Sequence, residues 1–294
     1  MPSLRCTVVN LVARHVLRAQ LARTPGPAEA RRDFNLFTRL LPCPSGVEMR
    51  PHPLGLSFAP PEPRASGTIL YFHGGGYICG APQTHRALAG CLARATGRQV
   101  ITARYRLAPE HPAPAAFDDA LCAFDAMEEM GTDPTEIILG GDSAGGGLAL
   151  ALLARLCADG RRPRALFAFS PWTDLTASGD SITANAARDR ILPADRLEDL
   201  VSFVTGDGPR DDPRVSPHFA SFDAPPPVMM QVARTEILYD DTRRMAEKLR
   251  AAGGDVTVTE VEDAIHVWPL LGNRLPEGRR SFEDVAAFLD TLPA

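Results

Sequence analysis

The sequence predicts a single α/β domain, spanning residues 1–294, with a mostly parallel sheet covered by helices on both faces. Three observations predict this fold class. The chain has 294 residues, 45% apolar and 23% charged, which suits one large globular domain. Short, nearly continuous apolar runs alternate with longer segments of helical periodicity. No internal repeat or low-complexity tract interrupts this alternation.

The N-terminal region precedes the alternation. Its first 21 residues, MPSLRCTVVNLVARHVLRAQL, have helical periodicity, and one broad face gathers Val8, Val9, Leu11, Val12, Val16 and Leu17. Arg14 and His15 interrupt the apolar run early and no small-residue cleavage site follows, so the segment is a poor signal peptide and too short to span a bilayer. The proline-rich residues 41–63 then suit short edge strands and turns.

The alternation itself begins near residue 68. Apolar runs predict strands at 68–72, 99–103, 136–140, 165–170, 228–233 and 256–261. Helical periodicity predicts helices near 84–96, 114–130, 144–159, 241–252 and 279–291. Residues 171–227 are too many for an ordinary crossover, and they follow a strand at the sheet edge where α/β folds bind ligands. We expect this insertion and the N-terminal helix to roof a pocket.

Charge and cysteine content argue against several classes of partner and site. The net charge is −5 and the arginines are scattered among acids, which does not suit a nucleic-acid partner. The six cysteines form no CxxC pair, so metal and redox sites are not expected, and free thiols suit a reducing cytoplasm. We expect no membrane partner and a cytoplasmic protein.

The most unusual stretch is EIILGGDSAGGG, residues 136–147. Gly141-Asp142-Ser143-Ala144-Gly145 fits G-x-S-x-G between an apolar strand and an apolar helix, which is the context of a nucleophile elbow. Taken alone, an incidental serine in a glycine-rich turn explains the motif about as well. No G-K-[ST] follows the glycines, so a phosphate-binding loop is excluded.

A second glycine-rich motif, His73-Gly74-Gly75-Gly76, directly follows the strand at 68–72. Glycines at the end of a strand let backbone N–H groups face a cavity, as in an oxyanion hole. We expect Gly75, Gly76 and Ala144 to supply these donors, and His73 to support the loop.

Four motifs in order, HGGGY (73–77), YRLAPEHPAPAAFDDA (105–120), GDSAGG (141–146) and SPWTDL (170–175), resemble the hormone-sensitive-lipase-like family of bacterial esterases, within the α/β-hydrolase superfamily. The resemblance runs from about residue 65 to the C-terminus. It implies an α/β-hydrolase fold with an eight-stranded, mostly parallel sheet. It also implies a helical cap, formed here by about 1–45 and 175–225, and hydrolysis of short- to medium-chain carboxylic esters without cofactor or metal.

Hydrolases of this fold order their triad as serine, acid, histidine. Only His266 lies between the last predicted strand and the last predicted helix, where the base belongs. The resemblance aligns Glu236 with the triad acid, whereas Asp240 and Asp241 open a helix that a carboxylate would cap. The predicted triad is therefore Ser143, Glu236 and His266, with Asp240 and Asp241 as alternatives for the acid.

The substrate is less well defined by sequence. We assign the aromatic residues Tyr77, Trp172 and Trp268 to the substrate pocket, and apolar residues of the insertion to the underside of the cap: Ile191, Leu192, Leu197, Leu200 and Phe203. Short acyl chains of about C2 to C8 or small cyclic esters are expected. Alternatives are a lactone hydrolase, an arylacetamide-type amidase or peptidase, and a non-catalytic small-molecule receptor. A homodimer through an edge strand is an open possibility.

Overall fold

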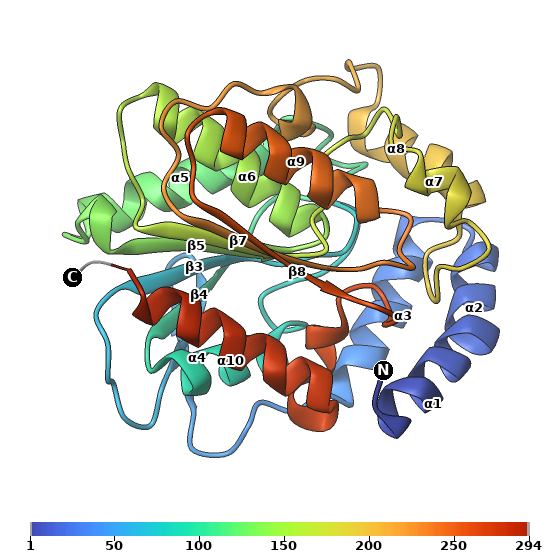
Figure 1. Ribbon diagram of the computed structural model, residues 1–294, viewed down its shortest axis with the longest axis horizontal. Coiled ribbons are helices and arrows are strands. Elements are labelled where there is room, and N and C mark those ends of the chain that lie inside the picture. The colour runs from blue at the N-terminus through green and yellow to red at the C-terminus, as the bar shows by residue number, and fades with distance from the viewer. Residues whose placement is uncertain (1, 293–294) are drawn as a thin grey trace.

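A computed structural model describes residues 2–292 (Figure 1). Its strands form one sheet in the order β1-β2-β4-β3-β5-β6-β7-β8. Strands β3 to β8 run parallel, while β2 is antiparallel to both β1 and β4. The strands are β1 Glu48–His52, β2 Gly55–Ala59, β3 Thr68–Phe72, β4 Gln99–Ala103, β5 Ile137–Asp142, β6 Ala165–Phe169, β7 Val228–Ala233 and β8 Val256–Val261. The predicted fold class is confirmed, and the proline-rich stretch forms the antiparallel edge as expected.

Helices cover both faces of the sheet (Figure 1). The core on one face includes side chains from α5, α6 and α9, and the core on the other includes side chains from α4 and α10. Helix α6 is buried along almost its whole length, which explains why its sequence is apolar all round. The helices are α4 Arg86–Thr96, α5 Ala115–Glu129, α6 Ala144–Ala158, α9 Tyr239–Ala251 and α10 Pro276–Asp290. Short 3₁₀ turns lie at η2 Pro134–Glu136, η4 Pro217–Phe219 and η5 Trp268–Arg274.

Two segments far apart in the sequence meet at one end of the sheet (Figure 1). The N-terminal segment contains α1 Leu4–Val12, the π-helical turn η1 Ala13–Leu17, α2 Arg18–Arg23 and α3 Pro27–Arg39. The insertion after β6 contains α7 Ser181–Ala184, η3 Ala194–Arg196 and α8 Leu197–Thr205. Arginine side chains join the two: Arg18 donates to the carbonyls of Ala186 and Asp189, and Arg196 to those of Ala22 and Thr24.

The N-terminal helix forms as predicted, but its apolar face is not buried. Val8, Leu11, Val12 and Val16 remain 49–59% exposed, whereas Cys6, Asn10 and Ala13 are buried. Of the predicted face, Val9 and Leu17 alone pack in part against the core cluster that includes Ala13 and Trp268. The expectation that the N-terminal helix helps to roof a pocket is met by Leu21 of α2, which lines the cavity over Ser143, and not by these four exposed residues. Among residues 2–292, no helix combines the length and the apolar character that crossing a bilayer requires.

Candidate active site

Ser143 occupies a strained turn between β5 and α6. Its φ and ψ are 50° and −122°, a conformation that is costly for a residue with a side chain. The flanking glycines are required by close packing, since a Cβ on Gly141 would lie 2.3 Å from the Gly145 carbonyl oxygen and one on Gly145 would lie 2.1 Å from that of Phe72. Ser143 is partly exposed and lines a cavity. The turn therefore presents a hydroxyl to that cavity, as a nucleophile elbow does.

The close packing around Gly145 predicts that a larger residue at this position destabilises the fold. Gly145→Ala forces α6 away from the end of β3, an overpacking that costs about 2–3 kcal/mol and lowers Tm by about 5 °C. Thermal unfolding monitored by circular dichroism measures the shift. Gly26→Ala is the matched control, because the nearest atom to its Cβ is a flexible Glu29 oxygen at 3.8 Å. Equal Tm values for the two variants contradict the prediction.

Asp142, next to the serine, ties the elbow to the loop that follows β3. Its Oδ1 accepts hydrogen bonds from the Tyr71 hydroxyl at 2.8 Å and the Gly74 N–H at 3.0 Å. The His85 Nε2 lies 3.2 Å from the same oxygen. Burial opposes ionisation, but His85 and the Tyr71 hydroxyl outweigh it and hold the pKa of Asp142 below its usual value. This role of Asp142 is not predictable from the G-x-S-x-G motif in which it lies, because Tyr71, Gly74 and His85 are distant in the sequence.

The loop after β3 presents two glycines to the same cavity as Ser143. Gly75 and Gly76 have φ values of 124° and 59°, and a Cβ on Gly75 would lie 2.2 Å from the Cys79 carbonyl oxygen. The Gly74 N–H is bound by Asp142, whereas the N–H groups of Gly75, Gly76 and Ala144 have no acceptor within residues 2–292. Backbone N–H groups without a partner, close to a candidate nucleophile, are what an oxyanion hole requires.

His73 lies behind this loop. Its ring stacks on Tyr105 with 4.2 Å between centroids, and the Tyr105 hydroxyl donates to the His73 carbonyl oxygen. Burial, with a smaller contribution from His85, lowers the pKa of His73 to about 3, so its ring is neutral. These contacts agree with the expectation that His73 supports the loop.

His266 and Glu236 form the second half of the site. The His266 Nδ1 lies 2.5 Å from Glu236 Oε2, while Glu236 Oε1 accepts from the Ser170 hydroxyl at 2.8 Å and the Ala233 N–H at 2.7 Å. Ser170, which no sequence pattern marked as part of the site, thus supports Glu236. His266 lines the cavity with Ser143, and its Nε2 has no hydrogen-bond partner among residues 2–292. Ser143, Glu236 and His266 are thus brought to one site.

The Glu236 carboxylate favours the protonated form of this imidazole. Burial lowers the pKa of His266, but the Glu236 carboxylate outweighs burial by charge and by hydrogen bonding, so that the pKa lies above its usual value of 6.5. Glu236 is itself 1% exposed. A buried carboxylate bound to Nδ1 leaves Nε2 as the ring nitrogen available to a neighbouring hydroxyl.

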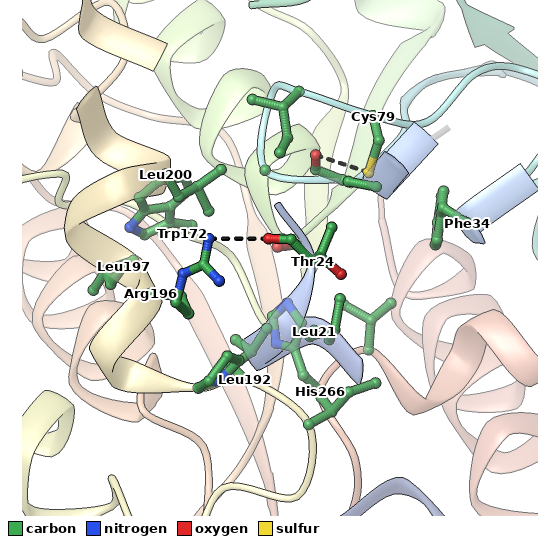
Figure 2. Close-up of a pocket in the computed structure, with 18 of the residues that line it drawn as sticks. Leu21, Thr24, Phe34, Cys79, Trp172, Leu192, Arg196, Leu197, Leu200 and His266 are labelled. Carbon is green, nitrogen blue, oxygen red and sulfur yellow. Dashed lines mark hydrogen bonds between the residues drawn. The ribbon is translucent and has the colours of Figure 1, made fainter. Parts of the chain in front are cut away.

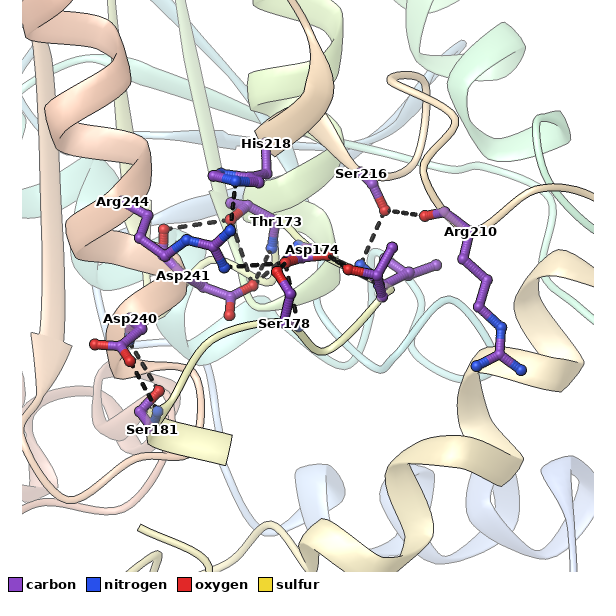
Figure 3. A network of polar contacts seen from close by, with 12 residues as sticks. Thr173, Asp174, Ser178, Ser181, Arg210, Ser216, His218, Asp240, Asp241 and Arg244 are labelled. Atoms are coloured by element: carbon purple, nitrogen blue, oxygen red, sulfur yellow. Dashed lines mark hydrogen bonds and ion pairs between the residues drawn. The ribbon is translucent and has the colours of Figure 1, made fainter. Parts of the chain in front are cut away.

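The two alternative acids face another part of the molecule (Figure 3). Asp240 accepts from the Ser181 N–H, and Asp241 accepts from the N–H groups of Thr173 and Asp174. The expectation that they cap their own helix is wrong, because both carboxylates bind amides of the segment after β6. Burial raises the pKa of Asp241 to about 7. Neither carboxylate contacts His266 among the described side chains, which leaves Glu236 as its partner.

The same network anchors the insertion to α9 (Figure 3). Arg244 of α9 binds Asp174 Oδ2 at 3.0 Å and His218 Nε2 at 2.6 Å. His218 lies in η4 of the insertion and takes part in packing it against α9. The contacts hold both ends of the insertion against α9.

The cavity over Ser143 has a volume of about 280 Å³ and an apolar lining (Figure 2). The insertion contributes all five residues that the sequence assigned to the underside of the cap: Ile191, Leu192, Leu197, Leu200 and Phe203. The N-terminal segment adds Leu21 and Phe34. Leu200 covers the glycine loop directly, since a Cβ on Gly76 would lie 3.0 Å from its Cδ2.

Of the three aromatic residues assigned to the pocket, Trp172 alone lines this cavity. Trp268 is fully buried, and its Nε1 donates to the Ser281 hydroxyl at 2.9 Å. The left-handed conformation of Val267, with φ 51°, places Val267 at the cavity while Trp268 packs toward α10. Tyr77 is 2% exposed and packs in the core, with its ring 6.2 Å from that of Trp172. The assignments of Trp268 and Tyr77 to the lining are wrong.

Comparisons with known proteins identify the family to which this fold belongs. The sequence model of a family described as "alpha/beta hydrolase fold" matches residues 69–270. The chain is 36% identical to an esterase of Acinetobacter venetianus, over 92% of each protein, and 41% identical to an acetyl-hydrolase of Streptomyces hygroscopicus, over 76% of this chain and 75% of that protein. A crystal structure of an esterase from the bacterial hormone-sensitive lipase family superposes with a TM-score of 0.92, at 33% identity over 99% of both chains.

Sequence and fold therefore agree with the four ordered motifs, and the chain belongs to the hormone-sensitive-lipase-like esterases of the α/β-hydrolase superfamily.

Proposed function

We propose that this member of the esterase family hydrolyses short- to medium-chain carboxylic esters with Ser143 as nucleophile, His266 as base and Glu236 as the acid that orients it. The observation that carries the proposal is the cavity itself. Its wall joins the strained Ser143, the imidazole bound to Glu236 and the two glycines with free N–H groups. A non-catalytic receptor has no need for a buried carboxylate that keeps an imidazole basic.

The reaction follows from the positions of these groups. His266 Nε2 takes the proton of Ser143 as its oxygen attacks the ester carbonyl, and Glu236 stabilises the imidazolium that forms. The N–H groups of Gly75, Gly76 and Ala144 bind the developing oxyanion, where the loss of one donor typically costs about 3–4 kcal/mol. His266 then protonates the departing alcohol, and water attacks the acyl-enzyme by the same route to release the acid.

The size and lining of the cavity predict the acyl preference. A cavity of about 280 Å³ lies at the small end of ligand sites, which span roughly 300–1,000 Å³, and its apolar wall favours an unbranched hydrocarbon chain. We expect kcat/KM toward p-nitrophenyl esters to be highest between about C2 and C8 and to fall at least about tenfold by C16, since each unburied methylene forfeits about 0.8 kcal/mol.

One substrate panel tests both the proposal and its nearest alternatives. The panel contains p-nitrophenyl esters from C2 to C16, small lactones and an arylacetamide, each assayed with the Ser143→Ala variant as the blank. Ester turnover that depends on Ser143 supports the proposal. Faster turnover of the lactones or the amide identifies the alternative substrate class, and no turnover of any member favours a receptor.

A further inference from the structure

The N-terminal helix packs through its small and polar side chains. Cys6, Asn10 and Ala13 are buried against the chain that follows β8, and Asn10 Nδ2 donates to the Asp263 carbonyl oxygen at 3.3 Å. At the start of the helix, the Ser3 N–H and hydroxyl both bind the Glu277 carboxylate. These polar contacts fix the rotation of the helix about its axis. It cannot turn its other face inward without leaving the buried amide of Asn10 unpaired, which is costly.

The face turned outward is apolar. Leu4, Val8, Leu11 and Val12 recur at the helical spacing of one face and are 82%, 54%, 59% and 49% exposed, and Val16 continues the face at 56%. We call these five residues the outer stripe. A contiguous row of exposed branched side chains on a charged protein marks an interaction surface.

The charged side chains on the helix that carries the outer stripe are all basic, while nearby carboxylates such as those of Glu277, Glu29 and Asp33 come from other elements. Arg5, Arg14 and Arg23 are exposed and form no ion pair within the described part of the chain. The first acidic residue of the whole sequence is Glu29, although the chain carries a net charge of −5. An apolar stripe flanked by unpaired arginines is the pattern of a helix that lies in the interface of an anionic membrane.

We propose that the outer stripe and its arginines dock this protein onto the surface of an anionic phospholipid bilayer. This inference goes beyond ester hydrolysis and does not depend on it. The expectation of no membrane partner rested on the lack of a spanning segment, whereas a helix lying in the interface needs only a row of apolar side chains and adjacent cations. A second copy of the chain is a poorer occupant, because a two-fold contact through the stripe brings the arginines of both copies into one interface.

The position of the stripe links docking to the cavity. The helix continues through η1 into α2, where Leu21 and the following Thr24 line the cavity over Ser143. A groove of about 520 Å³ between this helix and α3 is lined by Val16, Arg23 and Thr24 among others, so it joins the stripe to the cavity wall. Docking therefore brings the cavity wall near the lipid surface.

The test is vesicle sedimentation with the full chain and no substrate. Sucrose-loaded vesicles of equal parts palmitoyl-oleoyl phosphatidylglycerol and phosphatidylcholine are compared with pure phosphatidylcholine vesicles. We expect the chain to bind the anionic vesicles at least about tenfold more tightly and to be released by 0.5 M NaCl. Equal binding to the two compositions, or no binding to either, overturns the proposal.

Two variants assign the binding to this helix. Arg5→Gln/Arg14→Gln should weaken binding to the anionic vesicles about 30-fold, because each arginine near the surface contributes about 1 kcal/mol of attraction. Leu4→Ser/Leu11→Ser should weaken binding about tenfold or more, because two apolar side chains no longer enter the bilayer. The control for the arginine variant is Arg155→Gln/Arg243→Gln, which removes two exposed arginines from α6 and α9. The control for the leucine variant is Met130→Ser/Phe219→Ser, because Met130 and Phe219 are 51% and 43% exposed on other parts of the surface. Controls that weaken binding as much as the test variants overturn the proposal.

Two further measurements separate the competing outcomes. Analytical ultracentrifugation measures the oligomeric state of the parent chain and of Leu4→Ser/Leu11→Ser. If the parent is a dimer and the variant is a monomer, the outer stripe is an interface between two copies of the chain, and the proposal is contradicted. Hydrolysis of soluble p-nitrophenyl butyrate should be unchanged in all four variants, which shows that they fold. A chain that docks without hydrolysing esters contradicts the proposed function alone, and a chain that hydrolyses without docking contradicts this inference alone.

Discussion

Ser143→Ala is expected to lower kcat toward a short p-nitrophenyl ester by about 10⁴-fold or more, and His266→Ala by a similar factor. The physical reason is that nucleophile and base act as one unit, so that losing either removes the covalent route. The oxyanion donors and the cavity remain in both variants and leave a small rate above that in water. The double variant should therefore be little slower than either single one. Steady-state kinetics on purified protein measure all three.

Folding must be shown to survive these substitutions. Ser143 has a positive φ that alanine also adopts only at a cost, so the alanine variant replaces a hydroxyl without adding backbone strain. Its Tm should stay within a few degrees of that of the parent. Turnover near that of the parent in either single variant contradicts the assignment of the nucleophile or of the base.

The sequence predicted the sheet well because parallel strands buried on both faces are written as continuous apolar runs. All six predicted segments from residue 68 onward became strands, as in β3 and β7, whose bounds match the prediction, although the edge strand β8 is only partly buried and its sequence alternates. The glycines of the elbow were also predictable from the sequence. A Cβ at Gly141 or Gly145 would lie only 2.1–2.3 Å from a backbone oxygen, so no residue with a side chain larger than hydrogen fits there. Where local backbone packing or strand burial restricts the residue type, the sequence alone was sufficient to predict the structure.

The sequence failed where tertiary contacts decide the direction of a side chain. Trp268 directly follows Val267 in the sequence. Because Val267 has a left-handed backbone conformation, Val267 lies at the cavity whereas the Trp268 side chain packs in the core. The periodicity of the N-terminal helix revealed an apolar face but not which face packs, because polar contacts of Ser3 and Asn10 set its rotation. Asp142 was overlooked because its partners, Tyr71 and His85, are distant in sequence.

The second large effect is expected at Glu236. Glu236→Gln keeps the size of the side chain but removes the negative charge 2.5 Å from His266 Nδ1. In a triad the corresponding change of acid to amide lowers kcat by about 10⁴-fold, since the imidazole takes the wrong tautomer and its cation loses its partner. The Glu236 carboxylate raises the pKa of His266, so its loss should lower that pKa. The acid limb of the kcat/KM profile, on which activity rises as His266 loses its proton, should then move to lower pH.

Asp240→Asn is the matched control, because that carboxylate accepts from the Ser181 N–H, a bond that an amide oxygen can also accept. It should change kcat less than about tenfold and leave the acid limb in place, as surface substitutions away from a reacting group do. The pH profile is the decisive measurement, since a merely structural role for Glu236 would lower activity without moving the limb. The reverse order, with Asp240→Asn severe and Glu236→Gln mild, assigns the acid to the start of α9 instead.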